Sequence, residues 1–199
     1  KLFSNTTIYG SLYDYYLYLS IKDNRYWNAY IATSSIKSDF TYYITPDNTL
    51  KFGVKLNSHT INPGNYYSKE QQYFTLPYVP KRYVDERVFY LSNEQKPWKN
   101  ILLSFGLRMP VWINTGKTTV FEFNQKHRVI DTTHYADKEI ISSTINLEPR
   151  INVTFKTSST SNLSLSYNYT TQHLQLLSNS ISPFTSLEVW YPSGPNIKP

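Results

Sequence analysis

This chain contains no cysteine, few glycines and no long apolar run, and each shortage argues against a class of protein. Without cysteine it can form neither disulfides nor thiolate metal sites. Only 6 glycines occur in 199 residues, and the sequence contains no phosphate-cradling glycine loop. No segment approaches the run of about 18 apolar residues that a membrane-spanning helix requires. The length suits one domain, which is neither a disulfide-stabilised secreted module nor a helical membrane protein.

Aromatic residues, by contrast, are abundant, with 19 Tyr, 10 Phe and 4 Trp. Tyrosine is favoured at membrane–water interfaces because its ring is apolar and its hydroxyl is polar. The formal net charge is +6, but Lys and Arg are spread along the sequence and form no basic cluster. We therefore expect no nucleic-acid partner.

The most informative pattern is a two-residue alternation of apolar and polar side chains. It is clearest at 146–156, where Leu147, Ile151, Val153 and Phe155 alternate with Asn146, Glu148, Arg150, Asn152, Thr154 and Lys156. The alternation recurs at 100–111 and 163–172, in segments as long as a tilted membrane-crossing strand. Strands of soluble sheets centre on about five or six residues. The sequence thus predicts an all-β fold, a segment of a transmembrane antiparallel up-and-down β-barrel.

Strand-like runs fall at 1–20, 28–45, 49–61, 83–93, 100–113, 139–156 and 163–177. The connections at 45–48, 93–99 and 157–162 are short, whereas those at 62–82, 114–138 and 178–198 are long. Outer-membrane barrels have short periplasmic turns and long external loops, although the short link at 21–27 breaks this rule. Pro110 and Pro149 lie inside strand-like runs, and we expect a bulge at each because proline cannot donate to the ladder.

Candidate functional residues follow from which face of the sheet each side chain takes. Glu148 and Arg150 are two residues apart and share the polar face with Asn146, while Arg108 and Gln172 take the same face of neighbouring runs. In a barrel this face lines the lumen, where charged groups tie strands together, hold a plug or contact a substrate.

A second candidate set is aromatic and belongs to the 62–82 connection. It consists of Tyr66, Tyr67, Tyr73 and Tyr78, which either stack on a ligand or form an interface girdle. The histidines at 59, 127, 134 and 173 lack metal-site spacing, and no nucleophile elbow or paired catalytic carboxylates occur. We therefore expect no metal, no cofactor and no enzymatic activity.

Four segments near the end of the chain resemble, in order and spacing, the C-terminal barrel half of Bacteroidetes TonB-dependent outer-membrane receptors. They are residues 147–150, 165–168, 172–179 and 192–199, and residues 50–54 and 103–108 look like two earlier strands of that family. The resemblance implies that residues 1–199 supply about seven or eight strands of a barrel of about 22 strands in the bacterial outer membrane.

The resemblance also implies a function and partners. Such receptors import a siderophore, cofactor, glycan or peptide, and the TonB complex energises them through an N-terminal region that we expect outside this chain. The implied partners are outer-membrane lipid, the plug domain of the same full-length protein and a surface lipoprotein. The family offers no catalytic residues to carry over.

Two other functions fit the alternation. A free-standing eight-stranded outer-membrane protein could act as an adhesin or anchor, because about eight strands can close into a barrel. A soluble carbohydrate-binding β-sandwich also has strands with one apolar and one polar face.

Overall fold

A computed structural model describes residues 1–22, 24–68, 79–177 and 188–199. All regular structure in these residues is β. The strands are β1 (Leu2–Ser20), β2 (Arg25–Thr45), β3 (Asn48–Tyr67), β4 (Arg82–Trp98), β5 (Ile101–Thr115), β6 (Thr118–Phe123), β7 (Val129–Tyr135), β8 (Ile140–Ile145), β9 (Glu148–Lys156), β10 (Asn162–Asn168), β11 (Leu174–Leu176) and β12 (Trp190–Pro192). The described residues include no helix long and apolar enough to cross a membrane.

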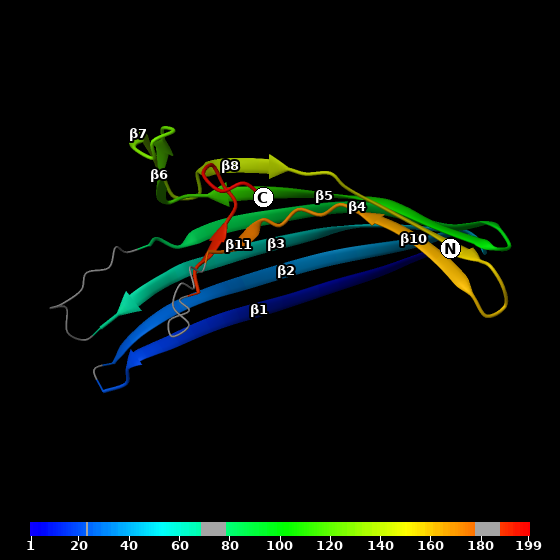
Figure 1. Cartoon of the computed structure of the whole chain (residues 1–199), viewed down its shortest axis with the longest axis horizontal. Coiled ribbons are helices and arrows are strands. Elements are labelled where there is room, and N and C mark those ends of the chain that lie inside the picture. The colour runs from blue at the N-terminus through cyan, green and yellow to red at the C-terminus, as the bar shows by residue number, and fades with distance from the viewer. Residues whose placement is uncertain (23, 69–78, 178–187) are drawn as a thin grey trace.

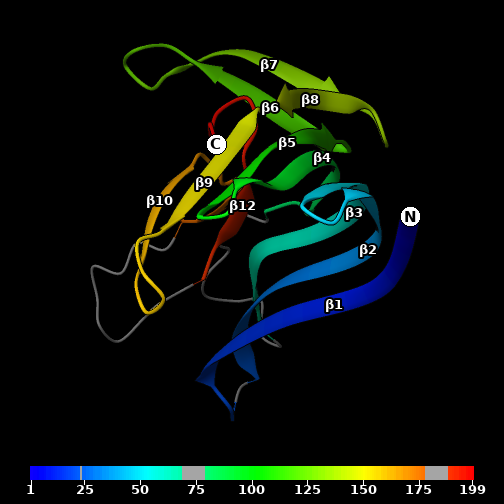
Figure 2. The same ribbon diagram turned by 90° about the vertical axis from the view of Figure 1, so that its right-hand side faces the viewer.

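Eight strands form one antiparallel sheet in the order β1-β2-β3-β4-β5-β9-β10, with β8 paired to β5 beside β9. The sheet curls like half of a barrel, so one face is concave and the other convex (Figures 1 and 2). The pair β6–β7 projects from one end of this sheet, and β12 lies inside the curve (Figure 2). The predicted all-β antiparallel fold is therefore confirmed.

Residues that face each other across antiparallel strands share a side of the sheet, so the register assigns each row of residues to one face. One concave row runs through Asp39, Gly53, Tyr90, Arg108 and Glu148. The adjacent convex row runs through Phe40, Phe52, Leu91, Leu107 and Pro149. The predicted alternation at 100–111 and 146–156 thus corresponds to the two faces of the sheet.

The run expected at 139–156 is divided into β8 and β9, yet its register does not change. Val111 faces Ile145 before the gap and Leu107 faces Pro149 after it, which is one continuous alignment. The bulges expected at Pro110 and Pro149 are therefore wrong. Both prolines serve the ladder through their carbonyls, which accept from the backbone N–H groups of Asn146 (3.1 Å) and Tyr169 (3.1 Å). The register shifts instead near the end of β5, at Asn114/Thr115.

Two other sequence expectations need correction. The run at 163–177 is not one strand, because β10 ends at Asn168 and residues 169–173 leave the sheet before β11. The connection at 114–138 contains the hairpin β6–β7, whose turn is held by the Asn124 side chain accepting from the backbone of Lys126 and Arg128. Part of the long connection at 178–198 lies outside the described residues, while residues 188–199 pass along the concave side.

Buried apolar side chains are few in the described residues and gather on the concave side. Ile61, Val84 and Trp112 form the core, and Ile31, Leu174 and Trp190 pack against it. This core lies between the concave face of β2 to β5 and the β11–β12 pair. The convex face, in contrast, leaves large apolar side chains exposed.

Candidate functional site: the concave face

Glu148 is the centre of a polar network on the concave face, and its side chain has no solvent exposure. Its Oε2 accepts from Nη1 of Arg108 at 2.6 Å. Its Oε1 accepts from the backbone N–H of Thr171 at 3.0 Å and from the Thr171 hydroxyl at 2.7 Å. A buried carboxylate is stable only with such partners. Thr171 lies in the segment 169–173, so this carboxylate ties that segment to the barrel-like sheet.

Arg108 extends the network toward a second carboxylate. Its Nη2 donates to Oε1 of Glu86 at 3.1 Å, while Oε2 of Glu86 accepts from Nδ2 of Asn57 at 2.5 Å. Nε2 of His59 lies 3.9 Å from the same Oε2. One guanidinium therefore bridges two carboxylates on different strands, which its planar set of donors allows.

Aromatic rings continue the site toward the end of the sheet. Trp112 lies between two imidazoles, with ring centroids 5.8 Å from His59 and 4.9 Å from His173. Nδ1 of His173 is 2.9 Å from the Ser193 hydroxyl, and the Ser193 carbonyl accepts from Nε1 of Trp112 at 3.3 Å and Nδ2 of Asn114 at 2.8 Å. Burial lowers the pKa of His173, a residue outside the strands, so the neutral ring is favoured in this stack.

The segment 188–199 is also held at the opposite side of the curve. The Tyr13 hydroxyl donates to the Glu188 carboxylate at 2.6 Å, and Nε1 of Trp27 donates to the Glu188 carbonyl at 3.1 Å. The Arg82 guanidinium lies 5.0 Å from the centroid of Tyr191. Segment 188–199 is thus bonded to β1 and β2 through Glu188 and to β5 through Ser193, and it crosses the concave side between them.

A cavity of about 510 Å³ lies beside the network, toward the short turns. Its cationic lining side chains come from four strands and are Lys37, Lys55, Arg108 and Arg150. Tyr90 forms part of the wall because it lies over Gly53 and donates to the Asp39 carboxylate. A side chain at position 53 would collide with that ring, since an added Cβ would meet Tyr90 atoms. Glycine is therefore required here by close approach rather than by backbone conformation.

The structure brings together some of the predicted lumen residues. Arg108 and Glu148 are in contact, and Nη2 of Arg150 lies 3.9 Å from Glu148. Asn146 shares their face, and its buried Oδ1 has no hydrogen-bond partner in the described part of the chain. Gln172 lies outside the network, is exposed, and donates to the Leu174 carbonyl.

The predicted loop aromatics are only partly described. Tyr66 and Tyr67 end β3, and the ring of Tyr67 stacks on Tyr26 with centroids 5.1 Å apart. Tyr73 and Tyr78 lie outside the described residues. Within the described ranges, no group of three or more potential metal ligands comes together.

Several residues of the network were missed by sequence reasoning, namely Asn57, His59, Glu86, Trp112 and Thr171. Glu86 stands between Asp85 and Arg87, so charged residues occupy consecutive positions of this strand. The two-residue alternation therefore does not show which of them faces inward. Thr171 lies where a continued strand was expected. No sequence signal marks the crossing of the chain onto the concave side.

Comparison with protein-family models, with curated proteins and with solved structures finds no match to this chain.

Proposed function

We propose that this chain is part of the barrel wall of a TonB-dependent outer-membrane receptor that imports a siderophore, cofactor, glycan or peptide. The observation that carries the proposal is the distribution of polarity on the curled sheet. Charged and buried polar groups occupy the concave face, and exposed apolar groups occupy the convex face. This arrangement suits a water-filled or plugged lumen surrounded by lipid.

The convex face has a band of suitable height. A mostly polar row, formed by Gly10, Ser34, Ser58, Asp85, Ile113 and Ser143, marks one boundary. From Ile145 to Phe155 the convex positions of β8 and β9 are then apolar. Ten steps of about 3.3 Å cover about 33 Å along the strand, or about 23 Å vertically at a tilt of 45°. That height agrees with the apolar band of about 25 Å in outer-membrane barrels.

Exposure within this band supports lipid contact. Ile8 is 76% exposed, Ile145 62% and Leu165 72%, although each is a large aliphatic residue. Water would make so much exposed aliphatic surface unfavourable, because transfer of each aliphatic side chain out of water is favourable by about 1.5–3 kcal/mol. Some convex positions are polar. Arg87 lies near the polar row, where its long side chain can reach the interface, while the Thr6 and Ser38 hydroxyls are 3.0 Å apart and Asn93 donates to Asn48. Exposed Tyr42, Tyr43 and Trp98 near the short turns suit an aromatic girdle.

The edges of the sheet favour part of a larger barrel over a closed barrel of eight strands. In the described residues β1 pairs with β2 and β10 with β9, and the two outer strands do not pair with each other. Unpaired backbone groups at both edges would cost several kcal/mol each in lipid. Further strands of a full-length barrel would satisfy them.

A soluble sandwich is also disfavoured. A sandwich buries the apolar faces of its two sheets against each other. Here the C-terminal segment covers the concave side, where the charged network lies, and leaves the apolar convex side open. Release of the full-length protein from cells without detergent would nevertheless support the sandwich and contradict our proposal.

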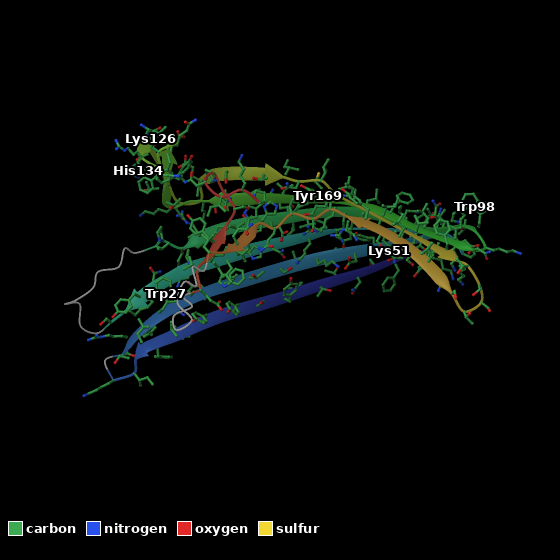
Figure 3. All side chains as sticks on the ribbon, viewed as in Figure 1. Trp27, Lys51, Trp98, Lys126, His134 and Tyr169 are labelled. Atoms are coloured by element: carbon green, nitrogen blue, oxygen red, sulfur yellow. The ribbon has the colours of Figure 1, made fainter. Side chains whose placement is uncertain are left out.

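Topology can be tested with single cysteines, because no native cysteine occurs in this region. Lys126 lies on the projecting β6–β7 hairpin, while Trp98 marks the opposite end of the sheet (Figure 3). A membrane-impermeant maleimide should label Lys126→Cys on whole cells, and should label Ser159→Cys only after permeabilisation. If Ser159→Cys alone is labelled on intact cells, the orientation in the membrane is the opposite one, and the placement of the long connections outside is contradicted.

A further inference from the structure

We propose that the cavity on the concave face binds a small anion carrying carboxylate or phosphate groups. The inference depends on the proposed function only in needing the concave face to be open to aqueous solute. The volume of the cavity, about 510 Å³, lies within the usual range of small-molecule sites, about 300–1,000 Å³.

The lining contains cations from four strands and no carboxylate. Lys37, Lys55, Arg108 and Arg150 line the cavity, whereas Asp39, Glu86 and Glu148 are absent from its lining. Two of the cations are already balanced, because Lys37 contacts Asp39 at 2.8 Å and Arg108 contacts both Glu86 and Glu148. The charge available to a ligand therefore resides on Lys55 and Arg150.

Lys55 has no carboxylate within ion-pair distance among the described residues, and its Nζ lies 5.8 Å from the ring centroid of Tyr9. Arg150 is 48% exposed, and Glu148 is 3.9 Å away and already bonded to Arg108 and Thr171. The guanidinium of Arg150 thus keeps donors for another partner. Lys55 belongs to β3 and Arg150 to β9, so the cavity offers a ligand with anionic groups cations from two different strands.

The lining also contains neutral donors. Ser92, Ser104, Asn152 and Asn168 all contribute to the cavity wall. Hydroxyl and amide groups supply hydrogen bonds to carboxylate or phosphate oxygens without adding charge. Gly106 also lines the cavity, and an added Cβ there would collide with Ser92 and the Leu91 carbonyl. At this point of the wall β5 is therefore closely packed against β4.

Isothermal titration of the full-length protein in detergent, with citrate and with pyrophosphate as separate probes, tests the proposal. We expect saturable binding of at least one probe at low salt. Lys55→Gln and Arg150→Gln should each weaken it by about tenfold, the effect of losing about 1.4 kcal/mol from one charge-assisted contact. Spermidine, a cation of comparable size, should not bind at this cavity.

Lys51→Gln is the matched control. Lys51 is a lysine of β3 that lies outside the cavity lining and is already paired with Glu94 at 2.8 Å (Figure 3). Its loss should leave probe affinity within about twofold, since exposed ion pairs contribute little. If Lys51→Gln weakens probe binding as much as the cavity variants do, the binding depends only on the overall positive charge of the protein, and the proposed site is overturned.

Two further outcomes would also overturn the proposal. The first is the absence of saturable binding up to millimolar citrate or pyrophosphate by folded protein. The second is that Lys55→Gln/Arg150→Gln lowers the unfolding temperature in probe-free buffer far more than Lys51→Gln does. In that case an acidic group of the protein itself occupies the cavity. Either outcome, in a protein that still requires detergent for extraction, contradicts the anion site and leaves the barrel proposal unaffected. The anion site and the barrel proposal can therefore fail separately.

Discussion

The convex and concave faces of the main sheet use alternate residues of the same strands, but they are organised differently. On the convex face large apolar side chains are exposed, and the specific contacts are between neighbouring strands, such as the stack of Phe40 on Phe52. On the concave face the charged groups at the centre have particular partners, as the Glu86–Arg108–Glu148 bridge illustrates. Two-residue alternation therefore predicts which face a residue takes, while partners on the concave face depend on the whole fold.

The largest effect should come from removing the buried carboxylate at the centre of the concave network. Glu148→Ala leaves Arg108 short of a partner and Thr171 with two unpaired donors, so we expect a loss of about 3–5 kcal/mol in the free energy of unfolding. Urea unfolding of the full-length protein in detergent would measure this. Glu94→Ala is the control: its pair with Lys51 is about half exposed and should contribute at most about 1 kcal/mol. Similar losses at both positions would mean that burial does not distinguish the two carboxylates.

A second prediction compares the faces directly at adjacent residues. Ile151→Arg puts a cation on the convex side near the middle of the apolar band, and should cost about 2–4 kcal/mol in vesicles. Asn152→Arg puts it on the concave side and should cost less than about 1 kcal/mol. Folding yields in lipid vesicles provide the measurement. Equal costs would contradict the assignment of lipid to the convex face.

The sequence predicted the strands better than the network. The alternation at 146–156 identified the facing of Glu148 and Arg150, because a half-buried strand repeats every two residues. It could not reveal Thr171, since the turn of the chain after Asn168 onto the concave side depends on Glu148, Trp112 and Ser193, all distant in sequence. The β6–β7 hairpin was missed because its strands are short and its turn depends on a single asparagine.

A smaller effect should distinguish two glycines that look equivalent in sequence. Gly53→Ala forces Tyr90 away from its contact with Asp39, because the added Cβ would overlap the ring. We expect a loss of about 1–3 kcal/mol in the free energy of unfolding, as for other overpacked sites. At Gly10 an added Cβ meets only the Thr33 carbonyl at 4.0 Å, so Gly10→Ala should be neutral or slightly stabilising. A destabilised Gly10→Ala together with an unaffected Gly53→Ala would show that Tyr90 does not require glycine beneath it.

The smallest expected effect is a pH dependence confined to the C-terminal segment. Because burial lowers the pKa of His173 in the folded protein, the unfolded chain binds the proton more readily. Stability from this residue is therefore complete above its unfolded pKa of about 6.5, and declines as the pH falls through that value toward the lower folded pKa. The negative charges of Glu86 and Glu148 raise this pKa and oppose the effect of burial, whereas the positive charge of Arg108 lowers it further.

Hydrogen exchange at the Ser193 amide, which donates to the His173 carbonyl at 2.6 Å, should report this change locally. After correction for the intrinsic pH dependence of exchange, its protection should fall between about pH 7.5 and pH 5.5, on either side of the unfolded histidine pKa of about 6.5. His173→Phe keeps a flat ring against Trp112 but cannot titrate, so its protection should not change over that interval. If the variant loses protection on acidification as the native protein does, a group other than His173 controls the segment.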